Sequence, residues 1–486
     1  MRGNGLDELL RELSAIVGRE RLVAHPDALR AYQSDGLTRH RAMPVAVVLP
    51  DDSAEVQKVV RALHGRRVPW VARGAGSGLS GGALPVADGV VIALTRLRRV
   101  LDVDLENSRV TVQPGVTNAQ VSAAVAPTHF YPPDPSSQVV CTIGGNVAEN
   151  AGGAHCFKYG FTTNYVCGVE LVLADGERVD LGGTEIDRPG LDLVGAIVGS
   201  EGTLGVVTRI TLRVIPVPEA QRTLIAFFAD TGSAGEVVSE LVGGSGVVPA
   251  AIEMMDELAL QAVEQAVNPG FPHAGAALLV ELDGPEAECA PHLDHVVEVC
   301  QRHGAEEVRV ARDAAERDRL WRARKAAFAA MGRVSPSYYV QDGVVPRTRL
   351  AEVLRRIDEL AAEHGLRVAN VFHAGDGNLH PLVCYDHAKP GEPERAELLA
   401  AEILSACIEA GGSITGEHGV GIDKKAQMPA MFADADLEAF QRLRCAFDPD
   451  GLANPGKVMP TPRLCGEVPG PYRRHPLELA GVAERL

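Results

Sequence analysis

Two histidines on one short ribbon have the residue type and spacing of metal ligands. In a segment with apolar residues on both sides, Asp376 and Gly377 form the strongest short hairpin signal in protein sequences. If these two residues are the turn, His373 pairs with His380 on one face of the ribbon. Cross-strand partners lie about 5 Å apart at Cβ, which suits two ligands of one metal ion. A lone histidine here would more often be an ordinary core residue, so the pairing carries the prediction.

A second segment, the glycine-rich stretch 411–421, supplies an adjacent carboxylate and imidazole, Glu417 and His418. Two histidines and one glutamate make an open metal site of the catalytic type. Nitrogen and oxygen ligands suit Zn²⁺, Mn²⁺ or Fe²⁺, and the sequence does not choose among them. The same ligand set also suits water activation, so a metal-dependent hydrolase is one hypothesis at this stage.

A glycine-rich loop, Arg73 to Ala83, follows a predicted strand at 68–72. Its spacing matches G-x-G-x-x-G, the fingerprint of dinucleotide-binding folds. That fingerprint needs a helix that begins at the loop and faces the pyrophosphate. Successive backbone N–H groups can bind a diphosphate even without a helix, as an anion nest. The residues that exclude a helix here are Gly81, Gly82, Pro85 and Gly89.

Three further stretches rich in glycine, proline or serine lie in the same half of the chain: 131–137, 142–153 and 199–205. Each of them alone is ordinary turn chemistry. Four such loops in one domain, beside a metal-type site in the next, predict a large cofactor that lies between two domains.

The chain of 486 residues exceeds what one hydrophobic core usually supports. A βαβ pattern followed by strands, and then alternating strands and helices after the Pro-rich stretch 215–219, predict an α+β fold. The predicted parts are an N-terminal helical segment at 1–40, a first domain at 41–218, a second domain at 219–436, a C-terminal segment at 437–460 and a tail at 461–486.

Charge and cysteine usage argue against several classes of partner. A net charge of −17 at pH 7 argues against nucleic acid and against binding anionic lipid by charge alone. The nine cysteines are scattered with no C-x-x-C pair, which predicts a reducing compartment and no iron–sulfur cluster in this chain. The N-terminus carries acids where a signal peptide would be apolar, and no apolar run reaches membrane-spanning length. We therefore expect a cytoplasmic protein with no transmembrane segment.

Seven segments together resemble the FAD-linked oxidase family of the vanillyl-alcohol oxidase fold, also called the PCMH-type FAD-binding fold. Within that family the likeness is to the flavin subunit of bacterial glycolate oxidases and to D-lactate dehydrogenases. It covers roughly residues 40 to 460. The segments are Arg73–Gly82, Pro132–Ser137, Thr142–Asn146, Gly199–Gly205, His373–His380, Gly416–Gly419 and Asn454–Lys457.

The resemblance implies a PCMH-type FAD-binding domain of two α/β subdomains at 41–218. A cap domain, with an antiparallel sheet covered by helices, would follow at 219–436, and 437–460 would return to the FAD site. Members that tether FAD covalently often carry a histidine where this chain has Ser77, so we expect non-covalent FAD. The implied FAD-binding residues are Arg73, Gly74, Ala75, Gly76, Ser77, Gly78, Leu79, Pro133, Asp134, Ser137, Thr142, Gly144, Gly145, Asn146, Gly153, Glu201, Gly202, Val206 and Asn454.

The resemblance also assigns the chemistry. It places His418 as the acid/base group beside the metal ligands His373, His380 and Glu417. Arg324 would bind the substrate carboxylate, although its basic run could also be a solvated helix face. Relatives that oxidise D-2-hydroxyglutarate carry polar residues at the places of Phe328 and Leu382, so the resemblance favours a smaller substrate.

The function implied is FAD-dependent, metal-assisted oxidation of a small (D)-2-hydroxy acid, of the glycolate or D-lactate type, to the 2-keto acid. The hydride would pass to flavin N5. Electrons would then leave to an iron–sulfur subunit, a cytochrome or a quinone, and such a partner could hold the chain at the membrane surface. The alternatives are a D-2-hydroxyglutarate or longer 2-hydroxy acid dehydrogenase, and a non-catalytic flavin subunit of a larger complex. A homo-oligomer is also open.

Overall fold

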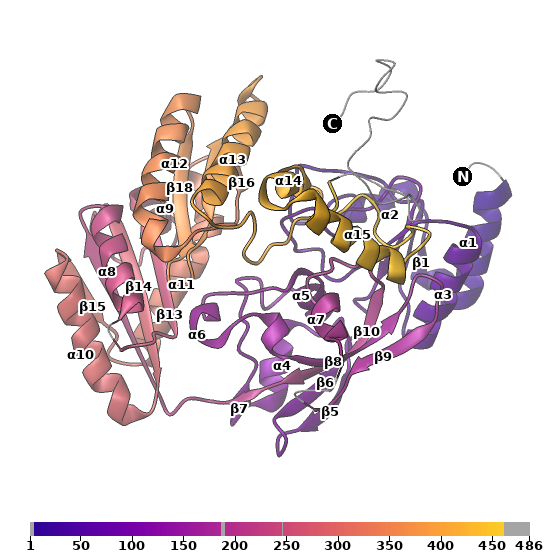
Figure 1. Ribbon diagram of the computed structural model, residues 1–486, viewed down its shortest axis with the longest axis horizontal. Coiled ribbons are helices and arrows are strands. Elements are labelled where there is room, and N and C mark those ends of the chain that lie inside the picture. The colour runs from indigo at the N-terminus through magenta and orange to yellow at the C-terminus, as the bar shows by residue number, and fades with distance from the viewer. Residues whose placement is uncertain (1–3, 186–189, 245, 461–486) are drawn as a thin grey trace.

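The structure is a computed structural model that describes residues 4–185, 190–244 and 246–460. The predicted tail at 461–486 lies outside the described residues. The chain forms an N-terminal domain and a cap domain, and the C-terminal helices α14 (Met428–Met431) and α15 (Asp434–Phe447) lie across the N-terminal domain (Figure 1).

The first subdomain has a four-stranded sheet in the order β1-β2-β4-β3. Strands β2, β4 and β3 run parallel, and β1 is antiparallel to β2. Helices α1 and α3 pack on this sheet, and the Asp52 side chain caps α3 by accepting the backbone N–H of Glu55. The bounds are α1 Asn4–Val17, β1 Leu22–Val23, α2 Pro26–Leu29, β2 Ala46–Val48, α3 Ser53–Gly65, β3 Trp70–Arg73 and β4 Val90–Ala93.

The second subdomain has a five-stranded antiparallel sheet in the order β5-β6-β10-β8-β9, with short helices on one side. The prediction of two α/β subdomains is therefore confirmed. The bounds are β5 Val100–Asp104, β6 Arg109–Val112, α4 Asn118–Val125, β7 His129–Phe130, α5 Ile143–Glu149, α6 Cys156–Tyr159, β8 Val166–Val172, β9 Arg178–Gly182, α7 Leu193–Ile197, β10 Val206–Arg213 and β11 Ile215–Pro216.

The cap domain is an antiparallel sheet with helices on both faces, as predicted (Figure 1). Alternate residues of β12 (Ala220–Phe228) supply two separate cores, because side chains of a strand point to opposite faces. Leu224, Ala226 and Phe228 face the helices α8 (Thr231–Gly243), α10 (Glu286–Arg302), α12 (Leu350–His364) and α13 (Glu392–Glu409). Ile225 and Phe227 face α9 (Glu257–Val267) and α11 (Ala314–Ala330), so residues 224–228 form a continuous apolar run.

The cap strands run in the order β15-β12-β14-β13-β18-β19-β17, and β20 pairs with β16 and β18. The bounds are β12 Ala220–Phe228, α8 Thr231–Gly243, β13 Ala251–Asp256, α9 Glu257–Val267, β14 Ala276–Gly284, α10 Glu286–Arg302, β15 Glu307–Val310, α11 Ala314–Ala330, β16 Ser337–Val340, β17 Gly343–Val344, α12 Leu350–His364, β18 Arg367–His373, β19 Asn378–Leu379, β20 Pro381–Tyr385 and α13 Glu392–Glu409.

The C-terminal segment returns to the first subdomain beside β3. The backbone of Trp70 exchanges hydrogen bonds with Leu452 and Asn454, each at 2.8 to 2.9 Å. Within the described residues, no helix combines the length and apolar character needed to cross a bilayer.

Candidate active site

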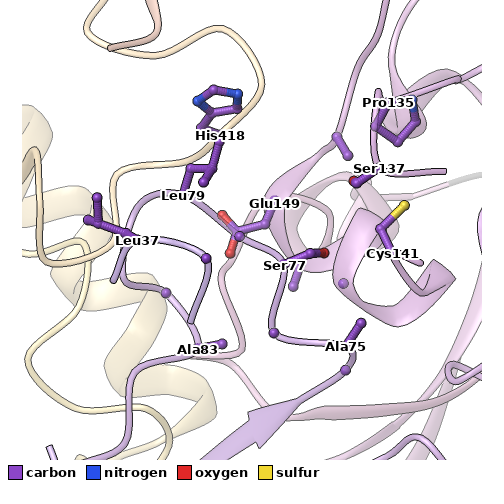
Figure 2. A pocket seen from close by; sticks show the side chains of 18 of the residues that line it. Leu37, Ala75, Ser77, Leu79, Ala83, Pro135, Ser137, Cys141, Glu149 and His418 are labelled. Carbon is purple, nitrogen blue, oxygen red and sulfur yellow. The ribbon is translucent and has the colours of Figure 1, made fainter. Parts of the chain in front are cut away.

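A cavity of about 720 Å³ lies between the two domains. Its walls come from the glycine-rich loop after β3, from α5, from the loop before β10 and, on the cap side, from α11, β16 and the metal-type cluster. Figure 2 shows Ser77 of the glycine-rich loop, Ser137 and Glu149 around this space, with His418 at its cap side. The cavity therefore joins both groups of residues that the sequence singled out.

The glycine-rich loop continues from β3 without a helix, as predicted. A Cβ on Gly74 would overlap the hydroxyl of Thr142, and Gly76 has a φ of +72°, which side chains disfavour. The Thr142 hydroxyl and the side-chain amide nitrogen of Asn146 line this region and have no hydrogen-bond partner among the described residues. Buried polar groups of this kind need a partner, so the wall fits a polar ligand such as FAD.

Most of the predicted FAD-binding residues line the cavity. They are Arg73, Gly74, Ala75, Gly76, Ser77, Gly78, Leu79, Ser137, Thr142, Gly144, Gly145, Asn146, Glu201 and Gly202. Thr142 is the N-cap of helix α5, and Gly144, Gly145 and Asn146 lie in its first turns. The glycines of this stretch had instead indicated turns.

Five of the predicted FAD residues lie outside the lining of this cavity: Pro133, Asp134, Gly153, Val206 and Asn454. The carbonyl of Pro133 accepts a hydrogen bond from Asn118. Asp134 contacts Nδ1 of His155 at 2.9 Å, and Nε2 of that ring lies 3.2 Å from Glu281 of the cap. Asp134 therefore takes part in a contact between the domains.

The other three residues have packing or supporting contacts and do not line the cavity. Gly153 lies against Asp134, where a Cβ would overlap the Asp134 backbone. Val206 is buried at the start of β10. The Asn454 side-chain amide donates to the carbonyl oxygens of Gly82 (2.9 Å) and Glu201 (2.6 Å). Asn454 thus supports two of the loops that line the cavity.

The predicted pairing of His373 with His380 was wrong, but the prediction that both side chains lie on the same face of the ribbon was right. His373 pairs with Asn378 rather than with His380, because residues 374–377 form a four-residue turn. A shift of two residues along one strand keeps the same side chains on the same face. The two imidazoles therefore still meet, with ring centroids 5.0 Å apart and rings at 88°.

The Glu417 carboxylate completes the cluster. Its Oε1 lies 3.3 Å from Nε2 of His373 and 3.2 Å from Nε2 of His380. Burial would raise the pKa of Glu417, but hydrogen bonds from the two imidazoles hold that pKa well below its usual range. Burial would likewise lower the pKa of His373, but Glu253 and Glu417 raise it well above its usual range. The cluster therefore favours a positive charge at its centre, and its donors fit a divalent metal.

A second set of three groups, Asp342, His380 and His418, also lies close enough to share an ion. Asp342 already accepts hydrogen bonds from backbone N–H groups, and Nζ of Lys424 lies 3.2 Å from its Oδ2. A cation there would compete with these donors and with the ammonium group. The geometry thus favours His373, His380 and Glu417 as the metal ligands over the set with Asp342.

His418 lines the cavity at the edge of the cluster (Figure 2). Its ring stacks on His380, with centroids 4.9 Å apart and an angle of 13° between the planes. Burial lowers the pKa of His418 to about 4, so the imidazole is neutral at pH 7 and can accept a proton. Its Nε2 lies 3.8 Å from Oε1 of Glu417.

Arg324 lies one layer behind the cluster. Its guanidinium is buried and forms an ion pair with Glu253 (2.6 Å), whose other oxygen contacts Nδ1 of His373 (2.7 Å). Arg324 therefore does not lie on a solvated helix face, and it is not among the residues that line the cavity. Its Nε has no hydrogen-bond partner among the described residues. Phe328, one turn later on α11, lines the cavity. The centroids of its ring and of the His380 ring are 5.8 Å apart.

Four further residues in or next to the site were not predicted from the sequence: Glu253, Asp342, Lys325 and Glu149. Glu253 stands in the apolar strand β13 directly opposite His373, and a single glutamate in a buried strand was a usable signal, because buried carboxylates need partners. Lys325 and Glu149 line the cavity. Burial and the neighbouring charge of Glu201 raise the pKa of Glu149 well above its usual range.

Family models match both halves of the chain. Residues 44–182 match the FAD binding domain family, and residues 217–458 match the C-terminal domain of FAD linked oxidases. The chain is 47% identical to the glycolate oxidase subunit GlcD of Escherichia coli (strain K12) over 446 residues, which cover 91% of this chain and 89% of the relative.

The D-lactate dehydrogenase of Archaeoglobus fulgidus is 33% identical, over 92% of this chain and 98% of the relative. Among solved structures, p-cresol methylhydroxylase matches with a TM-score of 0.79 at 18% identity, over 94% of this chain and 97% of that one. A 4-ethylphenol oxidase from Gulosibacter chungangensis matches with a TM-score of 0.78 at 19% identity, over 95% of this chain and 98% of that one. With its two FAD-oxidase domains, PCMH-type fold and relatives of this identity, the chain belongs to the FAD-linked oxidases.

Proposed function

We propose that this FAD-dependent oxidoreductase converts a small (D)-2-hydroxy acid, of the glycolate or D-lactate type, to the 2-keto acid. The observation that carries the proposal is a neutral imidazole, His418, beside a His-His-Glu cluster on the wall of the FAD-type cavity. The relatives named glycolate oxidase subunit and D-lactate dehydrogenase support this substrate class. Membership of the FAD-linked oxidases replaces the hydrolase hypothesis.

Two groups that bind in this site supply part of the chemistry. FAD, held by the loop from Gly74 to Leu79 and by the start of α5, supplies a hydride acceptor. One divalent metal, Zn, Mn or Fe, held by His373, His380 and Glu417, supplies a Lewis acid.

The protein groups then divide the remaining work. His418 accepts the proton of the substrate hydroxyl at a ring nitrogen, while the C2 hydrogen leaves as hydride. Arg324 does not line the cavity and is ion-paired with Glu253, so its proposed part in carboxylate binding is limited to the positive charge that it adds behind the cluster. Phe328 lines the cavity beside His380, whereas Leu382 is buried in a cap core outside the cavity lining. The apolar ring of Phe328 favours a small substrate side chain over a second carboxylate.

We expect FAD to be bound non-covalently. Covalent tethering needs a nucleophilic side chain next to the flavin, and Ser77 stands in the glycine-rich loop where relatives with covalent FAD often carry histidine. Acid precipitation of the purified protein should leave the yellow chromophore in the supernatant, with a covalent flavoprotein treated in parallel as the control. Colour in the washed pellet would contradict this assignment.

The proposed function predicts that glycolate or D-lactate reduces the flavin of the holoenzyme under anaerobic conditions. The measurement is bleaching of the flavin absorption band across a panel of 2-hydroxy acids. L-lactate tests the stereochemistry and D-2-hydroxyglutarate tests the size limit. Faster reduction by D-2-hydroxyglutarate or a longer acid would favour the alternative substrate. If no hydroxy acid bleaches protein that holds both FAD and metal, the chain is a non-catalytic flavin subunit.

Reoxidation of the reduced flavin tests the identity of the electron acceptor. We propose an iron–sulfur subunit, a cytochrome or a quinone as acceptor, because the relatives from Escherichia coli and Bacillus subtilis are each a subunit of glycolate oxidase. Reoxidation of the reduced flavin by an artificial dye should outpace reoxidation by oxygen, and equal rates would count against a partner. A cytoplasmic location, peripheral to the membrane through that partner, and a homo-oligomer belong to the same proposal.

A further inference from the structure

Asp342 lies between β16 and β17, away from the cavity, with no exposed surface. Its carboxylate is the meeting point of several donors from one short segment and its neighbours. They are the backbone N–H groups of Gly416 (3.1 Å), Glu417 (3.2 Å) and His418 (2.8 Å), the hydroxyl of Thr415 (2.6 Å), the side-chain amide of Asn378 (2.8 Å) and the ammonium of Lys424 (3.2 Å).

This convergence sets the backbone of residues 415–418. On an extended segment, the side chains of Glu417 and His418 would point in opposite directions. Three successive N–H groups that point at one carboxylate bend the segment into a concave turn, as in an anion nest. The bend brings both side chains to the same cluster, so the glycines permit this turn and Asp342 imposes it.

Asp342 also faces two imidazoles from behind. Its Oδ1 lies 3.7 Å from Nδ1 of His380, and its Oδ2 lies 3.9 Å from Nδ1 of His418. The Nε2 atoms of both rings point instead toward Glu417, at 3.2 and 3.8 Å. Both separations from Asp342 are longer than a hydrogen bond, and the backbone carbonyl oxygen of Gln341 lies nearer to Nδ1 of His380, at 3.4 Å. Asp342 therefore acts on the two rings through its negative charge, from the side opposite Glu417.

We propose that Asp342 is the positioning residue of this active site: it folds residues 415–418 so that a metal ligand and a proton acceptor serve one substrate. This inference rests on the proposed roles of Glu417 and His418. Asp342 does not line the cavity and is not one of the three favoured metal ligands. A carboxylate has about four acceptor sites, and here its neighbours fill them.

The test is Asp342→Asn in the holoenzyme. Asparagine keeps the shape but turns one acceptor into an NH₂ group that faces N–H donors, so the turn should loosen. We expect Zn²⁺ affinity, measured by competition with a chromophoric chelator, to fall about 10- to 100-fold, with FAD content unchanged. At saturating Zn²⁺ the flavin reduction rate should stay about 10²-fold low, because His418 remains misplaced.

Two further variants keep the test decisive. Asp256→Asn is the matched control, because Asp256 is another buried cap carboxylate, which caps α9 and contacts Asn370 instead of the segment 415–418. Thr415→Val removes one donor to Asp342 and also the acceptor of the Gly419 N–H group, and it should cause a smaller loss in the same direction, even if Asp342→Asn folds poorly.

Wild-type Zn²⁺ affinity and rate in Asp342→Asn would overturn the inference. Full recovery of the rate at saturating Zn²⁺, or an equal loss in Asp256→Asn, would also overturn it. These outcomes differ from failure of the proposed function, in which the wild-type protein itself binds no metal or is not reduced by any 2-hydroxy acid.

Discussion

Replacement of His418 by asparagine is expected to lower the rate of flavin reduction by ~10²- to 10⁴-fold, the usual contribution of a positioned general base. The imidazole is neutral at pH 7 because burial lowers its pKa to about 4, and asparagine of similar size cannot accept the proton. FAD and metal should both stay bound, because His418 stacks on a ligand without completing the His-His-Glu cluster. Substrate affinity should change much less, since the metal would still bind the substrate carboxylate.

The measurement is anaerobic stopped-flow reduction at saturating substrate, with elemental analysis of the same samples. His364→Asn serves as the control, because this histidine lies at the end of α12 and pairs with Glu402. Loss of metal from the His418 variant would make His418 a ligand and favour the second cluster, with Asp342 and His380. A nearly normal rate would remove His418 from the chemistry.

The second large effect is expected from His380→Ala, which should abolish stoichiometric metal binding. The wild-type chain should hold about one divalent metal, as an open site with three protein ligands does. His380 belongs to both candidate clusters, so its removal breaks either of them. FAD should be retained, because the loop from Gly74 to Leu79 lies in the other domain and contributes none of the metal ligands.

Elemental analysis and the flavin spectrum of one preparation measure both outcomes. His373→Ala then separates the two clusters, because it should release the metal only from the His373, His380 and Glu417 site. Retention of one metal per chain in His380→Ala would show that the ligands were assigned incorrectly.

The sequence predicted which residues meet at the cluster better than it predicted how they meet. Asp376 and Gly377 indicate a two-residue turn, but the backbone N–H of Asn378 bonds to the Asp376 side chain and the turn takes four residues. The histidine pair survived this error because the side-chain period of a strand is two. Local signals therefore fix a face, whereas register depends on contacts with neighbouring strands such as β13 and β17.

The parts that could not be predicted depend on distant segments. Asp342 and Glu253 act on residues about 75 and 120 positions away, and no spacing rule connects them. The FAD motif at 132–137 predicted a cavity wall, but the wall is built from Pro135, Ser136 and Ser137, while Asp134 turns toward His155. A motif locates a stretch of chain at a ligand without showing which of its side chains face it.

The returning C-terminal segment has a consequence for the order of biosynthesis. The Asn454 side chain holds the carbonyl of Gly82, and the Lys457 ammonium holds that of Leu84 at 2.7 Å, across more than 370 residues of sequence. On a ribosome the glycine-rich loop therefore emerges long before the residues that support it, and the nascent N-terminal domain carries an unfinished cofactor site. We therefore expect the FAD site to be complete only after the cap has been made and residues 454–457 have folded back beside β3.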